Sequence, residues 1–167
     1  MYLFLIITVL SALPALITAN VDSTGGLKAI NDGRRIFAKK FNVANMNELE
    51  FDDDLANYAL SLQKKCLSRA ELITDKRYEV IPVFFKRPFS YPRYLDAFRS
   101  LGETSLTNPG QTKIGCIDDR VHCKDVDYNL IFVMGPLKKM SVVKNGPPGS
   151  QCDEGRVNRN GLCAKKQ

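Results

Sequence analysis

Apolar residues recur every three or four positions in two long stretches of this chain, which predicts two amphipathic helices. One helix is expected over residues 27–41, and the other from Asp52 to about Arg69. In the second helix the apolar positions are Leu55, Ala59, Leu62 and Cys66. A shorter helix is expected over 90–101, where a Ser-Tyr-Pro sequence supplies a starting signal.

β-branched and aromatic residues gather in shorter stretches, which predicts strands over 78–85, 111–117, 126–134 and, more briefly, 140–143. Pro82 restricts the first strand to a sheet edge, because proline has no N–H to donate to a neighbour. The run Ile131-Phe132-Val133 predicts a strand buried on both faces. A turn over 118–123 pairs the second and third strands as an antiparallel hairpin, so we expect a mixed α+β fold.

The N-terminal 19 residues are mainly apolar and end in a small residue, Ala19, as secretory signal peptides do. Pro14 interrupts the run, and the segment is short for the roughly 20 residues of a membrane span. We therefore predict cleavage after Ala19, secretion, and a mature chain that does not span a membrane. The remainder divides into a flexible leader (20–26), one domain (27–144) and a C-terminal extension (145–167) that is too short and polar for a core of its own.

All five cysteines follow the predicted signal peptide: Cys66, Cys116, Cys123, Cys152 and Cys163. Secreted proteins meet an oxidising compartment, so we expect disulfides. Because the number is odd, at most two bridges form within one chain. A bridge between Cys152 and Cys163 would close a small loop and tether the tail. The chain has a single histidine and no Cys-x-x-Cys pair, which argues against a zinc site.

The net charge of +6 is spread over separated basic pairs along the chain. Nucleic-acid binding favours a basic stripe with interleaved aromatic residues, so no nucleic-acid partner is expected. The acidic run Asp52-Asp53-Asp54 has two interpretations, a calcium site or a helix N-cap with favourable charge on the helix dipole. Three consecutive carboxylates do not converge on one ion unaided, which favours the cap.

Candidate catalytic groups do not form a recognisable set. The only histidine, His122, adjoins Cys123, and neither a nucleophile–base pair nor a nucleophile-elbow motif is present. Paired carboxylates would serve a glycosidase, but the candidates share no catalytic spacing. These candidates are Glu48, Glu50, Asp52 and Glu71. We therefore expect no enzymatic activity and no cofactor.

Two short motifs carry a family resemblance. Residues 45–52 read N-M-N-E-L-E-F-D and residues 112–116 read T-K-I-G-C. Together with the predicted helices, they resemble the CAP superfamily (SCP domain) of cysteine-rich secretory proteins, insect venom antigens and plant pathogenesis-related proteins. Phe51 stands where that family has tryptophan. The resemblance implies an α-β-α sandwich with a small antiparallel sheet, supported by disulfides. The helix positions that match are Ile30, Asn31, Arg34, Arg35, Ala38, Leu55, Ala59 and Cys66.

The resemblance also implies what this chain lacks. The family's cavity uses two histidines and two glutamates, the first histidine following the cysteine that ends the second helix. Here Cys66 is followed by Leu-Ser-Arg-Ala-Glu, and Glu103 comes too late to fill a cavity position. The second histidine belongs just before the Ile-Gly-Cys strand, where residues 108–111 read Asn-Pro-Gly-Gln. The chain is therefore identified as a degenerate member without the cavity histidines, and no metal is expected.

The pairing of the cysteines follows from the same resemblance. In cysteine-rich relatives the cysteine ending the second helix pairs with the second cysteine of the hairpin, which here implies Cys66–Cys123. The partner strand of Cys116 reads Ile-Phe-Val-Met and contains no cysteine. Cys116 then stays a thiol in a monomer or links two copies as a dimer, and the second bridge is Cys152–Cys163.

Three functions remain open on the sequence. The first is a secreted, non-enzymatic protein that binds an extracellular or cell-surface partner. The second, implied by the sterol-binding members of the family, is a small lipid or sterol carrier. The third is a secreted protease inhibitor or toxin-like module built around the cysteine-bearing tail.

Overall fold

The computed structural model describes residues 25–75, 77–84, 91–92, 95, 105–118, 123, 126, 128–136 and 141–167, and the backbone of 19–20. The predicted signal peptide up to residue 18, His122, and most of the helix predicted over 90–101 lie outside these ranges. Strand β1 (Ala19–Asn20) contains the residue after which cleavage is predicted. Cleavage after Ala19 would therefore leave only Asn20 of this strand in the mature chain.

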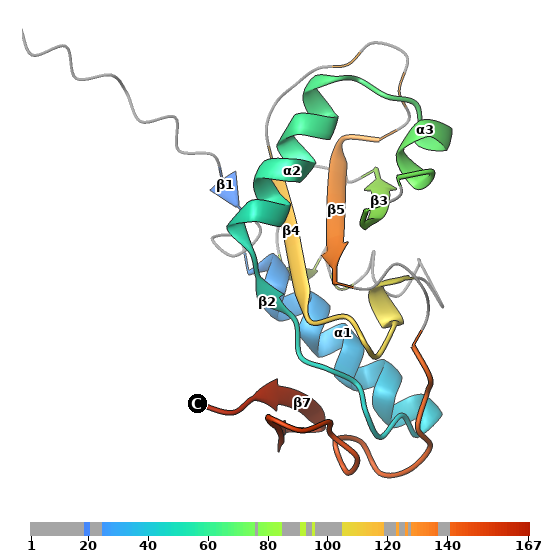
Figure 1. Ribbon diagram of the computed structural model, residues 1–167, viewed down its shortest axis with the longest axis vertical. Coiled ribbons are helices and arrows are strands. Elements are labelled where there is room, and N and C mark those ends of the chain that lie inside the picture. The colour runs from blue at the N-terminus through green and yellow to red at the C-terminus, as the bar shows by residue number, and fades with distance from the viewer. Residues whose placement is uncertain are drawn as a thin grey trace, which may run out of the picture.

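A five-stranded sheet lies between helices on its two faces (Figure 1). The strands run in the order β1-β4-β5-β3, and each pair of neighbours in that order is antiparallel. A short strand, β2, pairs with β4 in parallel. This arrangement confirms the predicted α-β-α sandwich. The elements are α1 (Gly26–Phe41), β2 (Glu50–Phe51), α2 (Asp53–Lys64), α3 (Arg69–Ile73), β3 (Glu79–Val83), the 3₁₀ helix η1 (Ser105–Thr107), β4 (Lys113–Asp118) and β5 (Leu130–Gly135).

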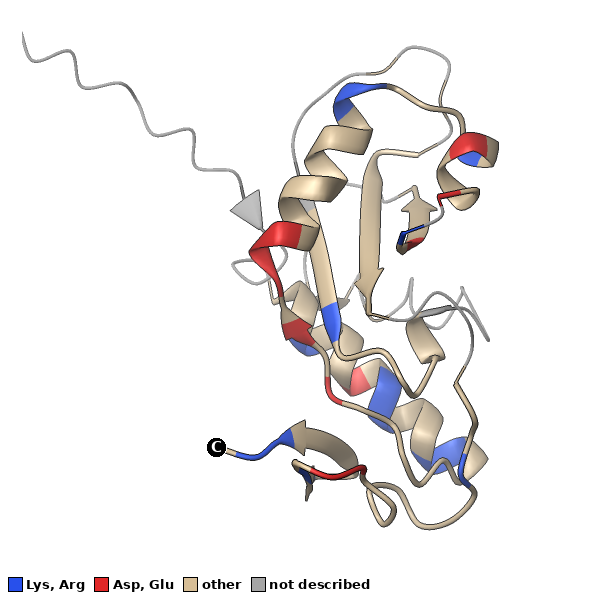
Figure 2. Ribbon diagram, in the orientation of Figure 1, with Lys and Arg blue, Asp and Glu red and all other residues tan. Residues whose placement is uncertain are grey.

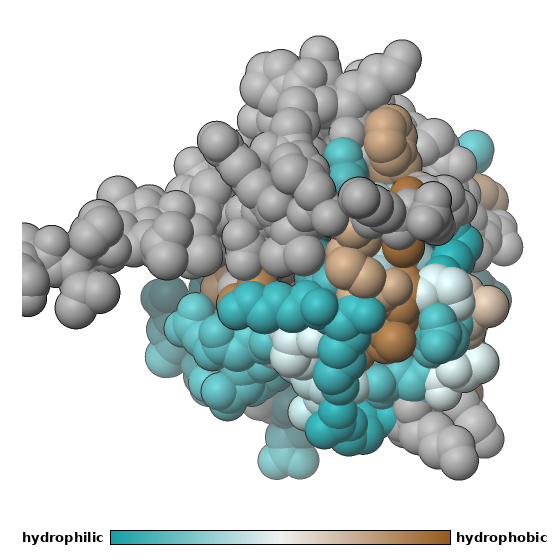
Figure 3. Space-filling model, turned by 90° about the horizontal axis from the view of Figure 1, so that it is seen from above, coloured by the Kyte–Doolittle hydropathy of each residue, from teal (hydrophilic) through white to brown (hydrophobic). Residues whose placement is uncertain are grey.

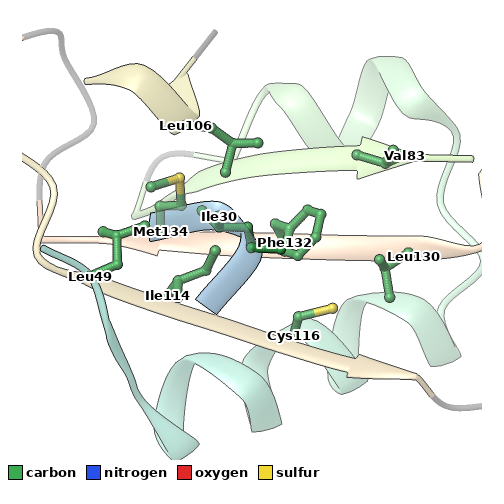
Figure 4. Packing of buried hydrophobic residues seen from close by; sticks show 10 residues of the cluster. Ile30, Leu49, Val83, Leu106, Ile114, Cys116, Leu130, Phe132 and Met134 are labelled. Carbon is green, nitrogen blue, oxygen red and sulfur yellow. The ribbon is translucent and has the colours of Figure 1, made fainter. Parts of the chain in front are cut away.

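Strand β5 is the centre of the core because its side chains alternate between the two faces. Leu130, Phe132 and Met134 pack in the cluster that includes α1 (Figure 4). Ile131 and Val133 pack with α2 and α3 on the opposite face. All five are at most 1% exposed. The expectation of a strand buried on both faces is therefore confirmed.

Gly115 in β4 allows helix α2 to lie directly on the sheet. A Cβ atom at this position would be 2.1 Å from the backbone nitrogen of Ala56 and 2.2 Å from the carbonyl carbon of Leu55. No side chain fits at such distances, so the glycine of the T-K-I-G-C motif is needed for close contact between helix and strand.

Helix α2 begins where the sequence predicts but ends earlier. Asp52 caps it by accepting a hydrogen bond from the backbone N–H of Leu55 at 3.0 Å, which confirms the cap interpretation of the acidic run. The predicted end near residue 69 is wrong, because the helix stops at Lys64 and Cys66 has a positive φ of 48°. Ser68 then starts α3 with its own capping box. A strand predicted over 140–143 is also wrong for residues 141–143, which form no regular structure.

The C-terminal segment forms a β-hairpin of β6 (Arg156–Arg159) and β7 (Leu162–Lys165). Asn160 and Gly161 connect the strands, both with positive φ, as in the Asn-Gly turns that favour hairpins. Leu162 packs against Ala38 of α1, with Val43 and Met46 completing the cluster. The segment therefore has no core of its own and joins the core beneath α1.

Replacing Gly115 with alanine should destabilise the domain by about 3 kcal/mol, because strand and helix backbones must separate to admit the methyl group. Gly135→Ala is the matched control, since a Cβ there meets side-chain atoms no closer than 3.6 Å. Its free energy of unfolding should change by less than about 1 kcal/mol. Denaturant unfolding measures both, and equal effects would contradict the close contact at Gly115.

Candidate functional site

A buried guanidinium fixes the geometry around the site. Arg34 of α1 is fully buried, and its Nε donates to the carbonyl of Asn47 at 3.0 Å. Its terminal nitrogens donate to the carbonyls of Leu106, Asn108 (3.0 Å) and Gln111 (3.4 Å). Burial lowers the pKa of the Arg34 guanidinium to about 9. Backbone carbonyls rather than a carboxylate therefore hold this charge, and they tie two distant segments to α1.

Asn31 ties the same connection to α1 one turn earlier. Its side-chain amide donates to the carbonyl of Leu49 at 2.9 Å and its side-chain oxygen accepts from the N–H of Leu49 at 2.9 Å. A carboxamide that exchanges both bonds in this way occupies the place of a peptide group on a neighbouring strand. At Leu49, the edge of residues 49–51 that faces away from β4 is therefore paired with the Asn31 side chain.

Two adjoining hollows of about 530 and 620 Å³ lie between α1, residues 48–51 and the β6–β7 hairpin. We call them together the hairpin groove. Both hollows include Leu27, Asn31 and Glu48. The groove is an open surface feature with mixed character, since apolar side chains alternate with charged ones. Its other lining residues are Lys28, Asp32, Arg35, Leu49, Glu50, Phe51, Arg159, Asn160, Lys165, Lys166 and Gln167.

The wall formed by α1 carries a compact ionic cluster. Asp32 pairs with Lys28 at 2.6 Å and with Arg35, and it accepts a hydrogen bond from the Tyr91 hydroxyl at 2.8 Å. Burial alone would raise the pKa of Asp32, but the hydrogen bonds from Lys28 and Tyr91, with the nearby positive charges, hold it below its ordinary value. Asp32 is therefore ionised at neutral pH, and its carboxylate is held by Lys28, Arg35 and Tyr91.

The charged side chains in the middle of the groove are paired less closely. The Glu48 carboxylate lies between Arg35 and Arg159, and both nitrogen–oxygen distances are 3.5 Å, at the long limit for an ion pair. Nε of Arg35 is buried and has no hydrogen-bond partner in the part of the chain that the structure describes. Lys165 and Lys166 meet no carboxylate among the described residues. Charges of both signs are thus interspersed along α1 and the connection beside the hairpin (Figure 2).

The candidate catalytic and metal residues do not converge. Glu71 belongs to the capping box of α3, Asp52 caps α2 and pairs with Lys113 at 2.6 Å, and Glu50 is exposed on β2. His122 and Glu103 lie outside the described residues. Within the described ranges, no three His, Cys, Asp or Glu side chains come together as metal ligands would. The donor set of this part of the chain does not fit a divalent metal.

The cysteines take the arrangement that the resemblance implies. Cys66 is joined to Cys123, and Cys152 to Cys163. Cys116 belongs to neither disulfide and is wholly buried in the cluster beneath α1. A bridge from Cys116 to a second copy would require this core to open, so the burial argues against a linked dimer.

A second surface feature lies at the end of the molecule where α2 and α3 are found. Viewed from above, apolar side chains are visible there, with hydrophilic residues along part of their border (Figure 3). Ile73, the last residue of α3, is 62% exposed. The hairpin groove, which has defined hollows and charged side chains, is the better-defined candidate site. None of the helices in the described part combines the length and apolar character needed to cross a bilayer.

Sequence reasoning missed the groove because one of its walls comes from the hairpin. The Asn-Gly pair at 160–161, which is a strong hairpin signal, would have revealed β6 and β7. Pairing of the hairpin with residues 46–48 was not predictable from the sequence, since more than a hundred residues separate them. That contact joins Met46 and Glu48 to Cys163 through backbone hydrogen bonds of 2.8 and 3.0 Å.

No protein-family model matches the chain, and no curated protein matches it by sequence. Solved structures do match. A hookworm platelet inhibitor is 18% identical with a TM-score of 0.60, over 85% of this chain and 89% of that one. Zinc-bound NaASP2 is 15% identical with a TM-score of 0.58, over 91% and 100%. Manganese-bound Ac-ASP-7 is 17% identical with a TM-score of 0.57, over 83% and 86%. At such identities the similarity establishes the fold.

Peptide mapping without reduction should recover Cys66 linked to Cys123 and Cys152 linked to Cys163. An alkylating reagent should leave Cys116 unmodified in the native protein and modify it once denaturant exposes the core, because its thiol is buried. A dimer that reduction dissolves, or a bridged Cys116 peptide, would show that this pairing is wrong.

Proposed function

We propose that this chain, which has the CAP fold, is a secreted, non-enzymatic protein that acts by binding an extracellular protein or cell-surface partner through its surface. The observation that carries the proposal is a retained fold without the cavity histidines that the family resemblance implies. The structural motifs are present in the sequence, whereas neither cavity histidine has a counterpart. With a single histidine in the chain, two imidazole ligands are not available.

The packing of the described core supports a role at the surface. Both faces of the sheet are filled by apolar side chains, and Arg34 occupies the space between α1 and residues 105–111. The well-formed hollows in the described part are open and lie at the surface. In the described part, a binding site on the surface is therefore better defined than one in the interior.

An inhibitory role is one form of this function. One protein with a similar structure is named as a hookworm platelet inhibitor, so the CAP fold serves a protein of that description. We extend to this chain only the general idea that binding blocks the action of another protein. The lipid-carrier alternative lacks a comparable observation, because the core residues pack against one another.

Native mass spectrometry of the protein secreted from eukaryotic cells should show a bare mature monomer. Because packed apolar side chains cover both faces of the described sheet, no adduct of lipid mass is expected. A labelled sample should also bind saturably to a component of extracellular fluid or cell surfaces. A stoichiometric lipid adduct together with no saturable binding would contradict surface recognition and support a carrier.

A further inference from the structure

The edge of strand β2 that faces away from β4 borders the hairpin groove, and at Phe51 it pairs with no backbone group of the described residues. The N–H of Glu50 donates to the carbonyl of Thr112, just before β4, at 2.9 Å, and the N–H of Asp52 donates to the carbonyl of Ile114 in β4 at 3.0 Å. Because backbone groups alternate in direction along a strand, those of Leu49 and Phe51 are directed to the opposite edge. Asn31 occupies the Leu49 position on that edge, and Phe51, next along it, lines the groove.

The charges beside this edge favour an anionic partner. Five cationic side chains and three carboxylates line the groove, which gives a local excess of two positive charges. Two of the carboxylates, Asp32 and Glu48, are already paired with residues of the groove. On the hairpin side, Lys165 and Lys166 meet no carboxylate among the described residues, and Arg159 is paired with Glu48 only at the long distance of 3.5 Å. These three cations are the ones that can turn to a partner in the groove.

We propose that the hairpin groove binds an extended peptide segment with acidic side chains, which pairs with the backbone of Phe51 and places its carboxylates against Arg159, Lys165 and Lys166. This assignment rests on the proposed function, since it names the surface and the chemical class of the partner. Apolar side chains of the peptide alternate with the acidic ones and lie on Leu27 and Phe51.

A peptide fits this surface better than a sulfated glycan does. A polyanion would bring a charge at every sugar and would meet the carboxylates of Asp32, Glu48 and Glu50 as well as the cations. An extended peptide brings acidic groups only at alternate positions and supplies the N–H and C=O groups that Phe51 requires. The Asn31–Leu49 pair already shows peptide-like hydrogen bonding on the same edge.

A library of random heptapeptides displayed on phage, panned against the mature protein, tests the assignment. Recovered sequences should alternate acidic and apolar residues. A synthetic peptide made from a recovered sequence should bind about tenfold more weakly to the triple variant Arg159→Gln, Lys165→Gln, Lys166→Gln, since three exposed charge pairs are lost. The matched control is Lys39→Gln, Lys64→Gln, Lys65→Gln, which removes the same charge from exposed positions outside the groove and should leave binding unchanged.

The backbone contact has its own readout. Binding should shift the amide resonance of Phe51 and slow its hydrogen exchange, and N-methylation of the central peptide bond should weaken binding several-fold. The assignment is overturned if no peptide is enriched, if enriched peptides lack acidic residues, or if the two triple variants bind equally. It is also overturned if a heparin-derived oligosaccharide binds more tightly than every peptide, which would identify a glycan partner.

These outcomes separate the assignment from the function on which it rests. Enriched peptides that bind elsewhere would end the role of the groove but leave surface recognition intact. A stoichiometric lipid adduct in native mass spectrometry, together with no saturable binding to extracellular components, would end surface recognition, whatever the peptide library gives.

Discussion

Arg34 is a fully buried cation without a carboxylate partner in the described structure, and much of the domain is arranged around it. Burying an unpaired charge is costly, so the guanidinium has to be surrounded by hydrogen-bond acceptors. The acceptors are carbonyls of residue 47 and of residues 106, 108 and 111. The connection after α1 and the loop before β4 therefore have to run close to the same side chain, although some sixty residues separate them in the sequence.

This constraint determines where the surface groove forms. The connection held by Arg34 continues into residues 48–51, which Asn31 fixes at Leu49 and β4 fixes at Glu50. The C-terminal hairpin then pairs with residues 46–48 and brings its cations opposite β2. The two cavity histidines that the family resemblance implies have no counterpart in this sequence, whereas the buried frame around Arg34 is present. The proposed role in surface recognition rests on this combination.

The sequence predicted most of the fold but little of the site. Local periodicity was sufficient for α1, α2 and β5, because each has a regular apolar face that depends on near neighbours. The end of α2 was predicted too late, because the positive φ of Cys66 interrupts the helix before α3 begins. The spacing of apolar residues gives no sign of such a backbone conformation. The importance of Gly115 came only from the family resemblance, and the structure explains it by the contact with Ala56.

The groove was beyond prediction because it depends on contacts between distant segments. Nothing in the local sequence places Arg159 beside Glu48, or shows that the backbone of Phe51 has no pairing partner among the described residues on the edge away from β4. Arg34 and Asn31 were noticed as family positions, but their partners are backbone groups, which no side-chain pattern reveals.

Hydrogen exchange measured by mass spectrometry on Arg34→Lys, under native conditions, tests the central claim most directly. Lysine keeps the charge but cannot reach all four carbonyls, so protection should fall together in residues 44–51, 105–112 and the β6–β7 hairpin. Protection of α2 and α3, on the other face of the sheet, should remain. A loss confined to α1, or an equal loss in every element, would show that Arg34 does not hold the frame on which the groove depends.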